Sequence, residues 1–354
     1  MSSNHFAKAA LFAVLIVIAF FAAWEIYLRS RGVQVAYDDG KELWSDKRAK
    51  VYQPSNEATV FIGSSRIKYD LDVATWRKLT GEDAVQLACE GTSPLPVLDD
   101  LAADEAFKGK LVIDVTEGLF FSDGGGGPNN VPAFIEYSKK RTPSEKASFV
   151  LNRGLESNLV FLDKDNYSLN ALFDKLQLKN RPGVFAMPLF PMEFGRVNFD
   201  RQNLMTAEFL TDTNLQNRVT GIWQFLRSVN KMPPASGAKL DSFFTVVKAR
   251  VDKIRSRGGQ VVFVRTPSSG PFWGGEQKGF PREKYWNPLL RLTNAPGIHF
   301  TDYFPIAHFV CPEWSHLSPQ DAITFTAHFV SLLEEKGWKF PHKNTTALSL
   351  NSKP

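Results

Sequence analysis

The sequence predicts an α/β protein built on a parallel sheet and joined to an N-terminal membrane helix. Short runs of β-forming residues alternate with segments of helical periodicity over residues 58–120, and the alternation returns over 240–337. Such alternation is typical of a parallel sheet that is covered by helices on both faces. The second observation is an apolar run at the N-terminus. With 43% hydrophobic and 22% charged residues, the chain has a globular composition.

The N-terminal segment has the length of a transmembrane helix. Residues 9–28 are apolar except for Glu25, and about 20 such residues cross ~30 Å of hydrocarbon. A cleaved signal peptide is the alternative, and it requires a small residue two positions before the last residue removed. Phenylalanine stands there for a site ending at either Ala22 or Ala23. We therefore predict an uncleaved anchor over residues 1–29.

A stalk and an α/β domain follow the anchor. Residues 30–57 are polar and mixed and form the stalk, the domain runs over 58–340, and a polar tail over 341–354 is predicted to be disordered. The regular repeat stops over residues 121–239, where segments rich in Phe and Pro replace it. This stretch is too long for a plain loop, so we predict an insertion with helices of its own.

The elements of the α/β domain are assigned from local patterns. Runs of β-branched and apolar residues that end in turn residues predict strands, over 58–63, 84–88, 110–115, 260–267 and 297–303. Apolar residues spaced by three and four positions predict helices, over 72–81, 94–107, 240–259 and 317–337. In the last helix Ser318 is a suitable N-cap and Pro319 suits the first helical position.

Polar side chains follow the carboxyl ends of the predicted strands, where function collects in open α/β sheets. The first strand runs into Gly63, Ser64 and Ser65, and the segment before the last helix holds Glu313 and His316. A serine that attacks an acyl group needs a base, a carboxylate that orients the base, and donors for the oxyanion. These residues supply nucleophile, acid and base in that chain order, although Gly-Ser-Ser is also common in turns.

Four segments together resemble a known superfamily. FIGSSR, ACEGTS, VIDVTEG and EWSHLSPQDA are similar to the successive blocks of SGNH, or GDSL-type, hydrolases. The resemblance is to the membrane-anchored branch that includes alginate O-acetylation proteins and the protein that transfers D-alanine to teichoic acid. It covers roughly 58–120 and 240–337 but not the insertion. It implies a flavodoxin-like three-layer sandwich with a central parallel sheet, the SGNH hydrolase fold.

The resemblance implies catalytic roles for particular residues. Ser65 matches the nucleophile, His316 the base, and Glu313 takes the place of the usual aspartate. The backbone N–H groups of Ser65 and Gly91 match the oxyanion hole.

The third block departs from the family pattern. It normally offers an asparagine as a further oxyanion donor, and Glu117 stands there instead. An ionised carboxylate only accepts hydrogen bonds, so we expect Thr116 or Thr92 to donate, or Glu117 to be protonated.

Further residues near these blocks are candidates for substrate binding. Arg66 and Arg265 could bind an anionic glycan, and the alternative is that these arginines are solvated or form salt bridges. Glu117 is a further candidate for substrate binding. Trp286 could stack on a sugar ring, and the alternative is a buried aromatic side chain. We expect no metal site, because no histidine pair has ligand spacing with carboxylates beside it, and we expect no cofactor.

The two cysteines and the charge balance restrict the remaining options. Cys89 and Cys311 fall beside the second and last blocks, so the resemblance suggests a disulfide near the site if the domain is extracytoplasmic; two buried free thiols are the alternative. The formal net charge is only +5, and no basic run is dense enough to predict nucleic-acid binding.

The resemblance implies a membrane-anchored serine O-acyltransferase or esterase that acts on a cell-envelope polysaccharide, with acetyl as the expected acyl group. A multispanning membrane-bound O-acyltransferase is the implied partner, and the periplasmic side of a bacterial inner membrane is the implied location. Glu117 suggests the alternative of a non-catalytic glycan-binding or scaffold protein on the same fold. Arg29 and Arg31 follow the apolar run, and the positive-inside rule instead favours a cytoplasmic domain.

Overall fold

The computed structural model describes residues 3–122, 130–176, 188–229 and 233–341. The chain divides into two compact units. The first contains Met1–Asp38 and Thr142–Met187, and the second contains Asp39–Arg141 and Pro188–Pro354. The predicted disordered tail lies outside the described residues, apart from its first residue.

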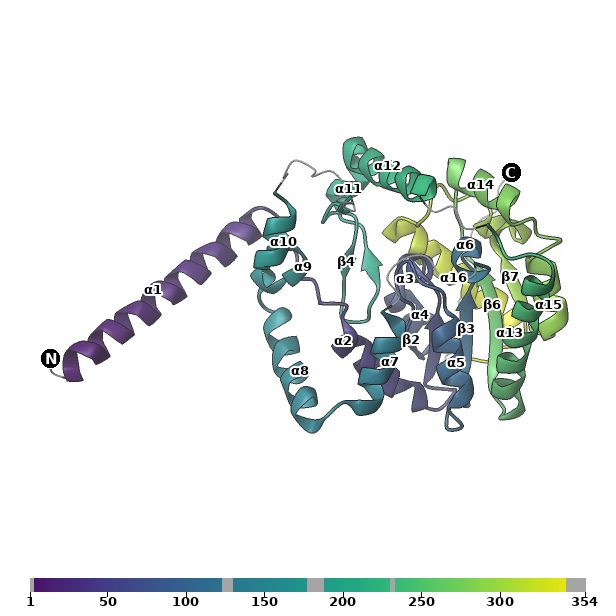
Figure 1. The fold of residues 1–354 in the computed structure, drawn as a ribbon, viewed down its shortest axis with the longest axis horizontal. Helices are drawn as coiled ribbons and strands as arrows, with labels where there is room; N and C mark the ends of the chain where they lie inside the picture. Colours follow the sequence, from purple (N-terminus) through teal and green to yellow (C-terminus); the bar gives the residue numbers. More distant parts are fainter. Residues whose placement is uncertain (1–2, 123–129, 177–187, 230–232, 342–354) are drawn as a thin grey trace. The chain divides into compact units, whose positions relative to one another are not determined.

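The second unit contains a five-stranded sheet in which all neighbouring strands are parallel (Figure 1). The strands run in the order β2-β1-β3-β6-β7, which is the order of a flavodoxin-like layout. The prediction of an α/β protein with a central parallel sheet is thereby confirmed. The strands are β1 (Ala58–Ile62), β2 (Asp83–Gln86), β3 (Lys110–Asp114), β6 (Gln260–Arg265) and β7 (Gly297–His299).

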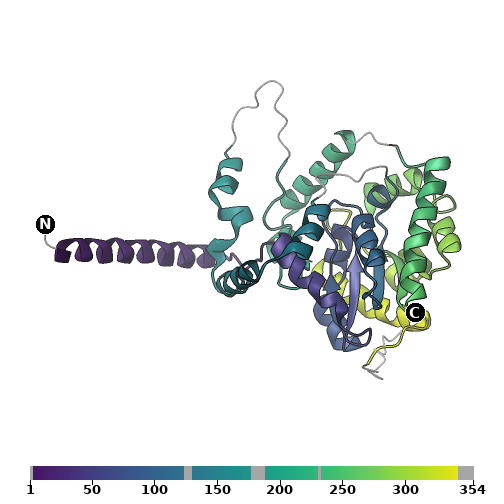
Figure 2. The same cartoon turned by 60° about the horizontal axis from the view of Figure 1, so that its bottom comes forward.

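Helices cover both faces of this sheet, and each face has its own hydrophobic core (Figures 1 and 2). Side chains alternate along β1, so Val60 and Ile62 enter one core while Phe61 enters the other. The first core lies under α5 (Leu95–Ala103), α13 (Ala238–Ser256) and α15 (Trp286–Thr293). The second lies under α3 (Ser65–Asp70), α4 (Val73–Thr80) and α16 (Pro319–Glu335).

Local signals set the ends of these elements. The Ser318 hydroxyl accepts the N–H of Asp321 and caps α16, while Gly81 ends α4 in the left-handed conformation at φ 74°. The strand predicted over 297–303 ends early at His299. The His299 ring accepts the N–H of Thr301 and starts a 3₁₀ turn there.

The second unit has further elements around this framework. They are α2 (Lys41–Arg48), η1 (Ala49–Tyr52), α6 (Glu117–Phe120), α7 (Val131–Lys140), β4 (Arg196–Val197), β5 (Asn203–Leu204), α11 (Ala207–Thr211), α12 (Thr213–Val229), α14 (Gly270–Gly279), η3 (Phe300–Asp302) and η4 (Phe304–Ile306). β4 and β5 form a small antiparallel ribbon.

The first unit is helical. It contains α1 (Ser3–Ser30), α8 (Pro143–Glu156), η2 (Val160–Leu162), α9 (Lys164–Tyr167) and α10 (Leu169–Asp174). Within the described residues, one helix, His5–Ser30, is long and apolar enough to anchor in a membrane, and a signal sequence would have the same properties. The segment predicted as one insertion is therefore shared, because residues 142–187 belong with α1 and residues 188–239 belong with the sheet.

Candidate functional site

Ser65 lies where β1 ends and α3 begins. Gly63 makes this turn possible, because a Cβ at that position would come within 2.6 Å of the Asp114 Cβ. The Ser64 hydroxyl then caps α3 by accepting the N–H of Arg66 at 3.4 Å. Ser65 is the first residue of the helix, and its side chain is only partly buried. The strand and the cap together hold the Ser65 hydroxyl at the carboxyl edge of the sheet.

Ser65, His316 and Glu313 form a continuous hydrogen-bonded relay. The His316 Nε2 lies 2.9 Å from the Ser65 Oγ, and the His316 Nδ1 lies 2.9 Å from the Glu313 Oε1. Because a carboxylate only accepts, Nδ1 carries the proton and Nε2 accepts from the serine. His316 and Glu313 are 1% and 0% exposed, so the relay is shielded from water except at the serine. This is the arrangement that activates a serine nucleophile.

The loop that carries Glu313 folds back on the carboxylate. The Glu313 Oε1 also accepts the backbone N–H groups of His316 at 2.7 Å and of Ser315 at 3.3 Å. Trp314 has φ 79°, an unusual conformation for a bulky residue. That conformation lets the chain reverse direction between the acid and the base.

A tryptophan from outside the sequence motifs completes the surroundings of the acid. The Trp223 Nε1 in α12 donates to the Glu313 Oε2. The ring of Trp223 also lies 5.9 Å from the His316 ring, and the rings of Tyr69 and Phe194 lie at 4.4 Å and 5.6 Å from it. These three aromatic residues were not predicted from the sequence, because no motif or spacing distinguished them from the many other aromatic residues.

Two backbone donors are free to serve an oxyanion. Within the described residues, neither the Ser65 N–H nor the Gly91 N–H has an acceptor. Gly91 is exposed and has φ 64°, which favours glycine. The expectation for Thr116 is corrected: its hydroxyl donates to the Asp114 Oδ2 at 3.1 Å and lies 2.6 Å from the Ser64 Oγ. Thr92 is likewise engaged, since its hydroxyl donates to the Cys89 carbonyl at 3.0 Å.

Glu117 belongs to a buried cluster of charges rather than to the oxyanion position. The Arg265 Nε donates to the Glu117 Oε1 at 2.9 Å, and the Arg66 Nη1 lies 3.9 Å from its Oε2. Glu276 pairs with both arginines. Burial opposes charge on Arg265, but Glu117 and Glu276 outweigh it and raise the pKa of its guanidinium. Arg66 and Arg265 are 1% and 0% exposed, so the prediction that they bind a glycan is wrong and the salt-bridge alternative holds.

The structure also contradicts the predicted sugar-stacking role of Trp286 and the suggested disulfide. Trp286 is 4% exposed and packs against His299 at 5.3 Å, so it offers no ring face to a sugar. Cys89 and Cys311 are both free, buried thiols rather than a disulfide. The thiol of Cys89 donates to the Leu87 carbonyl, and burial raises the pKa of both cysteines.

Two buried aspartates stand behind the relay. Asp70 accepts the N–H of Leu317, the residue directly after His316, at 2.9 Å. Burial raises the pKa of Asp70 to about 7, against the lowering influence of His316. Burial likewise raises the pKa of Asp114 to about 6. Neither was singled out from the sequence, because only the folded structure brings them to the site.

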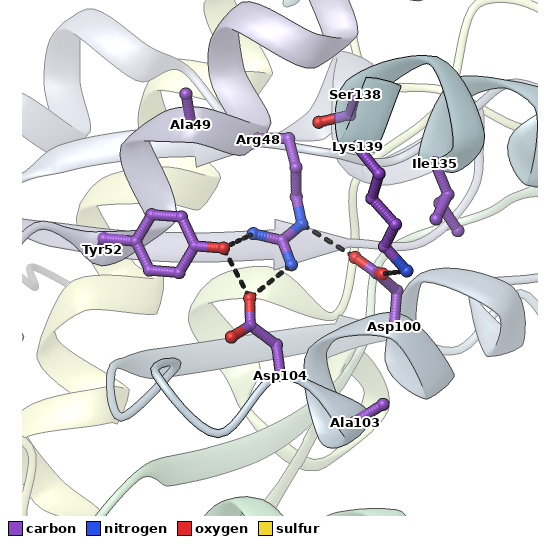
Figure 3. A pocket seen from close by; sticks show the side chains of 9 residues that line it. All are labelled: Arg48, Ala49, Tyr52, Asp100, Ala103, Asp104, Ile135, Ser138 and Lys139. Carbon is purple, nitrogen blue, oxygen red and sulfur yellow. Dashed lines mark hydrogen bonds and ion pairs between the residues drawn. The ribbon is translucent and has the colours of Figure 1, made fainter. Parts of the chain in front are cut away.

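A pocket of about 440 Å³ lies away from this relay, between α2, α5 and α7 (Figure 3). The charged side chains that line this pocket form ion pairs with one another. Arg48 pairs with Asp100 and Asp104, Lys139 pairs with Asp100, and the Tyr52 hydroxyl donates to Asp104. The pocket therefore leaves no charged group to recognise a ligand. Among the described residues, no group of three or more His, Cys, Asp or Glu could hold a metal ion.

Comparison with known proteins adds no relative. No protein-family model matches this sequence, and no curated protein matches it either.

Proposed function

We propose that this protein is a membrane-anchored serine O-acyltransferase or esterase that acts on a cell-envelope polysaccharide. The observation that carries the proposal is the Ser65–His316–Glu313 relay, with 2.9 Å at both side-chain links. The backbone N–H groups of Ser65 and Gly91, which have no acceptor among the described residues, support it. The resemblance of the sequence blocks to SGNH hydrolases supplies the substrate class.

The first half of the reaction transfers the acyl group to the enzyme. The Ser65 Oγ attacks the acyl carbonyl carbon while His316 Nε2 takes its proton. The resulting oxyanion is stabilised by the N–H groups of Ser65 and Gly91. When the bond from the carbonyl carbon to the leaving oxygen breaks, His316 returns the proton to that oxygen. The products are an acyl-Ser65 ester and a free alcohol.

The second half releases the acyl group. His316 takes a proton from the acceptor, either a sugar hydroxyl or water, as the acceptor oxygen attacks the acyl carbon. The ester bond to Ser65 breaks and His316 gives the proton to the Ser65 Oγ. A sugar acceptor makes the enzyme a transferase and water makes it an esterase. In our proposal the acyl group is acetyl, and a multispanning membrane-bound O-acyltransferase supplies it.

Contacts within the first unit support retention of the N-terminal helix as an anchor. The Glu25 carboxylate in α1 accepts the N–H groups of Val160 at 3.1 Å and of Phe161 at 3.2 Å. Arg29 donates to the Asn158 carbonyl at 2.8 Å. Removal of α1 as a signal peptide would leave these groups unpaired. In our proposal the second unit lies on the periplasmic side of a bacterial inner membrane, as the family resemblance implies.

Labelling with a fluorophosphonate tests the catalytic proposal. We expect the intact chain in detergent to form a covalent adduct that mass spectrometry places on Ser65, and we expect Ser65→Ala to lose it. Ser331→Ala is the control, because its hydroxyl is exposed on α16 and contacts the Ala327 carbonyl rather than His316; it should still react. Absence of an adduct on the wild type, or normal glycan acylation in cells carrying Ser65→Ala, would contradict the proposal.

A further inference from the structure

The first unit carries a stripe of exposed apolar side chains on α8. Val150, Leu151 and Leu155 are 65%, 70% and 51% exposed, and Ala147 and Gly154 on the same stripe are also exposed. The positions 147, 150, 151, 154 and 155 have the spacing of one face of an α-helix. The helix's buried residue, Phe149, lies on the opposite side. The unit's own packing therefore uses one face of α8 and leaves the apolar face uncovered.

A second stripe with the same spacing lies at α10. Leu169, Leu172, Phe173 and Leu176 are 67%, 44%, 55% and 57% exposed. The first three occupy positions i, i+3 and i+4 and share one side of α10, and Leu176, at i+7, lies two residues beyond the end of this helix. Two separate segments that each expose a regular apolar stripe are unusual on a protein surface in contact with water.

The segment that bears both stripes, residues 143–176, is joined to the end of α1, and we call it the collar. The Phe161 ring stacks on Phe21 at 5.1 Å, and the Tyr167 ring meets Trp24 edge-on at 6.3 Å. Figure 1 shows α9 and α10 beside that end of α1. Phe21 lies inside the apolar run, so the collar contacts α1 within the part of the helix that enters the membrane.

From this we propose that the collar lies in the interfacial layer of the bilayer, with the α8 and α10 stripes facing the lipid chains. The inference rests on the proposed anchoring of α1. The stretch of α1 from Phe21 to Tyr27 rises about 9 Å, and interfacial amphipathic helices sit about 5–10 Å into the headgroup and acyl boundary. Lys146 and Arg153 flank the α8 stripe, as is typical of helices that lie on anionic lipid surfaces.

Lipid is the occupant that the contacts favour, because both stripes extend a surface that already belongs to the membrane. The apolar surface of α1 is exposed from Phe6 to Tyr27, and the collar joins it through Phe21 and Trp24. A protein partner is the competing occupant. In vesicles that contain only this protein, a stripe meant for a protein partner would stay in contact with water, so the two occupants are distinguishable.

Single fluorescent labels test the proposal in the intact chain. Both native cysteines are buried, at 7% and 2% exposure, so a new surface cysteine reacts selectively. Leu151→Cys and Phe173→Cys place a label on each stripe. Asn152→Cys, on the polar side of α8, is the matched control, and Val14→Cys reports on α1 itself. Each protein is reconstituted in vesicles of phosphatidylcholine and phosphatidylglycerol, and quenching by brominated lipid is compared with quenching by iodide.

We expect brominated lipid to quench the labels at positions 151 and 173 roughly threefold more strongly than the label at position 152, with the opposite order for iodide. Equal quenching at 151 and 152, or stronger iodide quenching at 151, would overturn the inference and leave the stripes to a protein partner. If lipid quenches position 14 but not 151, the anchor stands and only the collar proposal fails. If lipid quenches neither, both fail. The Ser65 adduct is measured separately, so failure of the chemistry is distinguishable from either result.

Discussion

Glu313 and Glu117 are two buried carboxylates of the same domain, at 0% and 6% exposure, yet their surroundings differ. Glu313 faces the His316 ring, two backbone N–H groups and the Trp223 indole, all of them uncharged donors when the imidazole is neutral. Glu117 faces the guanidinium groups of Arg265 and Arg66. Neutral hydrogen-bond donors surround the carboxylate of Glu313, whereas positively charged arginines neutralise the carboxylate of Glu117.

These surroundings suit Glu313 to a part in the proposed reaction and Glu117 to a structural part in a buried cluster of ion pairs. Because only neutral donors surround Glu313, its negative charge remains available to stabilise an imidazolium at His316. The charge of Glu117 is neutralised by arginines, so it neither repels an oxyanion strongly nor assists the base. Buried ion pairs of this kind are costly to break rather than strongly stabilising when complete. In the mechanism that we propose, the sequence departure at Glu117 is therefore no obstacle.

The largest expected effect follows from replacing the acid of the relay. Glu313→Gln keeps the size of the side chain but removes the charge that stabilises the imidazolium, so we expect kcat to fall roughly 10³–10⁴-fold. Stability should change far less than activity. Steady-state hydrolysis of an activated acetyl ester measures the effect, with Ser65→Ala as the reference for zero turnover. A Glu313→Gln enzyme with near-normal kcat would show that Glu313 has no role in the reaction.

Glu117→Gln should have the opposite effect, because we expect it to lower the free energy of unfolding more than the reactivity of Ser65. The cluster of two arginines and two glutamates would carry an uncompensated buried charge, which costs about 3–5 kcal/mol of unfolding free energy. Urea unfolding in detergent measures the loss. The rate of fluorophosphonate labelling per folded molecule should change little. If labelling slows by orders of magnitude while stability holds, Glu117 belongs with Glu313 and the comparison breaks.

The same contrast shows how far the sequence could predict the site. Ser65, Gly91, Glu313 and His316 stand at the ends of elements whose order along the chain places them at one edge of a parallel sheet. The partners of Glu117 could not be found in this way. Its arginine neighbours come from α3 and β6, and an arginine beside a motif looks the same whether it faces solvent or a buried carboxylate.

Site residues that lie outside the alternating strands and helices were even harder to predict from the sequence. Trp223 reaches Glu313 from α12, within a region that carried no repeat, so neither periodicity nor spacing could relate it to a residue 90 positions away. The central parallel sheet could be predicted because short parallel strands depend on local apolar runs. The single predicted insertion gave no sign that residues 142–187 would pack with α1 rather than with residues 188–239.

Asp70 offers a third kind of carboxyl, because burial outweighs the donors that it accepts from, the Leu317 N–H and the Thr266 hydroxyl. The pKa of Asp70 is about 7 in the folded state and lies above the ordinary value of 3.8. Between these two pH values the folded protein therefore keeps a proton on Asp70 that the unfolded chain has lost. The resulting stability is present at low pH and is lost as the pH rises towards 7, by up to about 1.4 kcal/mol per pH unit. Asp70→Asn cannot ionise and keeps the acceptor for the Leu317 N–H.

We therefore expect the wild type to lose roughly 3 kcal/mol more unfolding free energy than Asp70→Asn between pH 5 and pH 8. Urea titrations of both proteins at the two pH values measure the difference. Asp114 is present in both and cancels. Parallel losses in the two proteins would show that Asp70 is ionised in the folded state and belongs with the charged carboxylates.

The smallest expected effect on the reaction comes from removing one hydrogen-bond donor to Glu313. Trp223→Phe keeps an aromatic ring beside His316 but removes the Nε1–H that reaches the Glu313 Oε2. We expect kcat to fall about tenfold with KM unchanged, which corresponds to the loss of one hydrogen bond to a charged group. With one donor fewer, the carboxylate is held less firmly against His316, so the loss should appear in kcat and not in substrate binding. Trp286→Phe, at a buried tryptophan remote from Glu313, is the control and should move neither. A loss of stability with kcat unchanged would mean that Trp223 only packs against the relay, and Glu313 would then depend on its backbone donors alone.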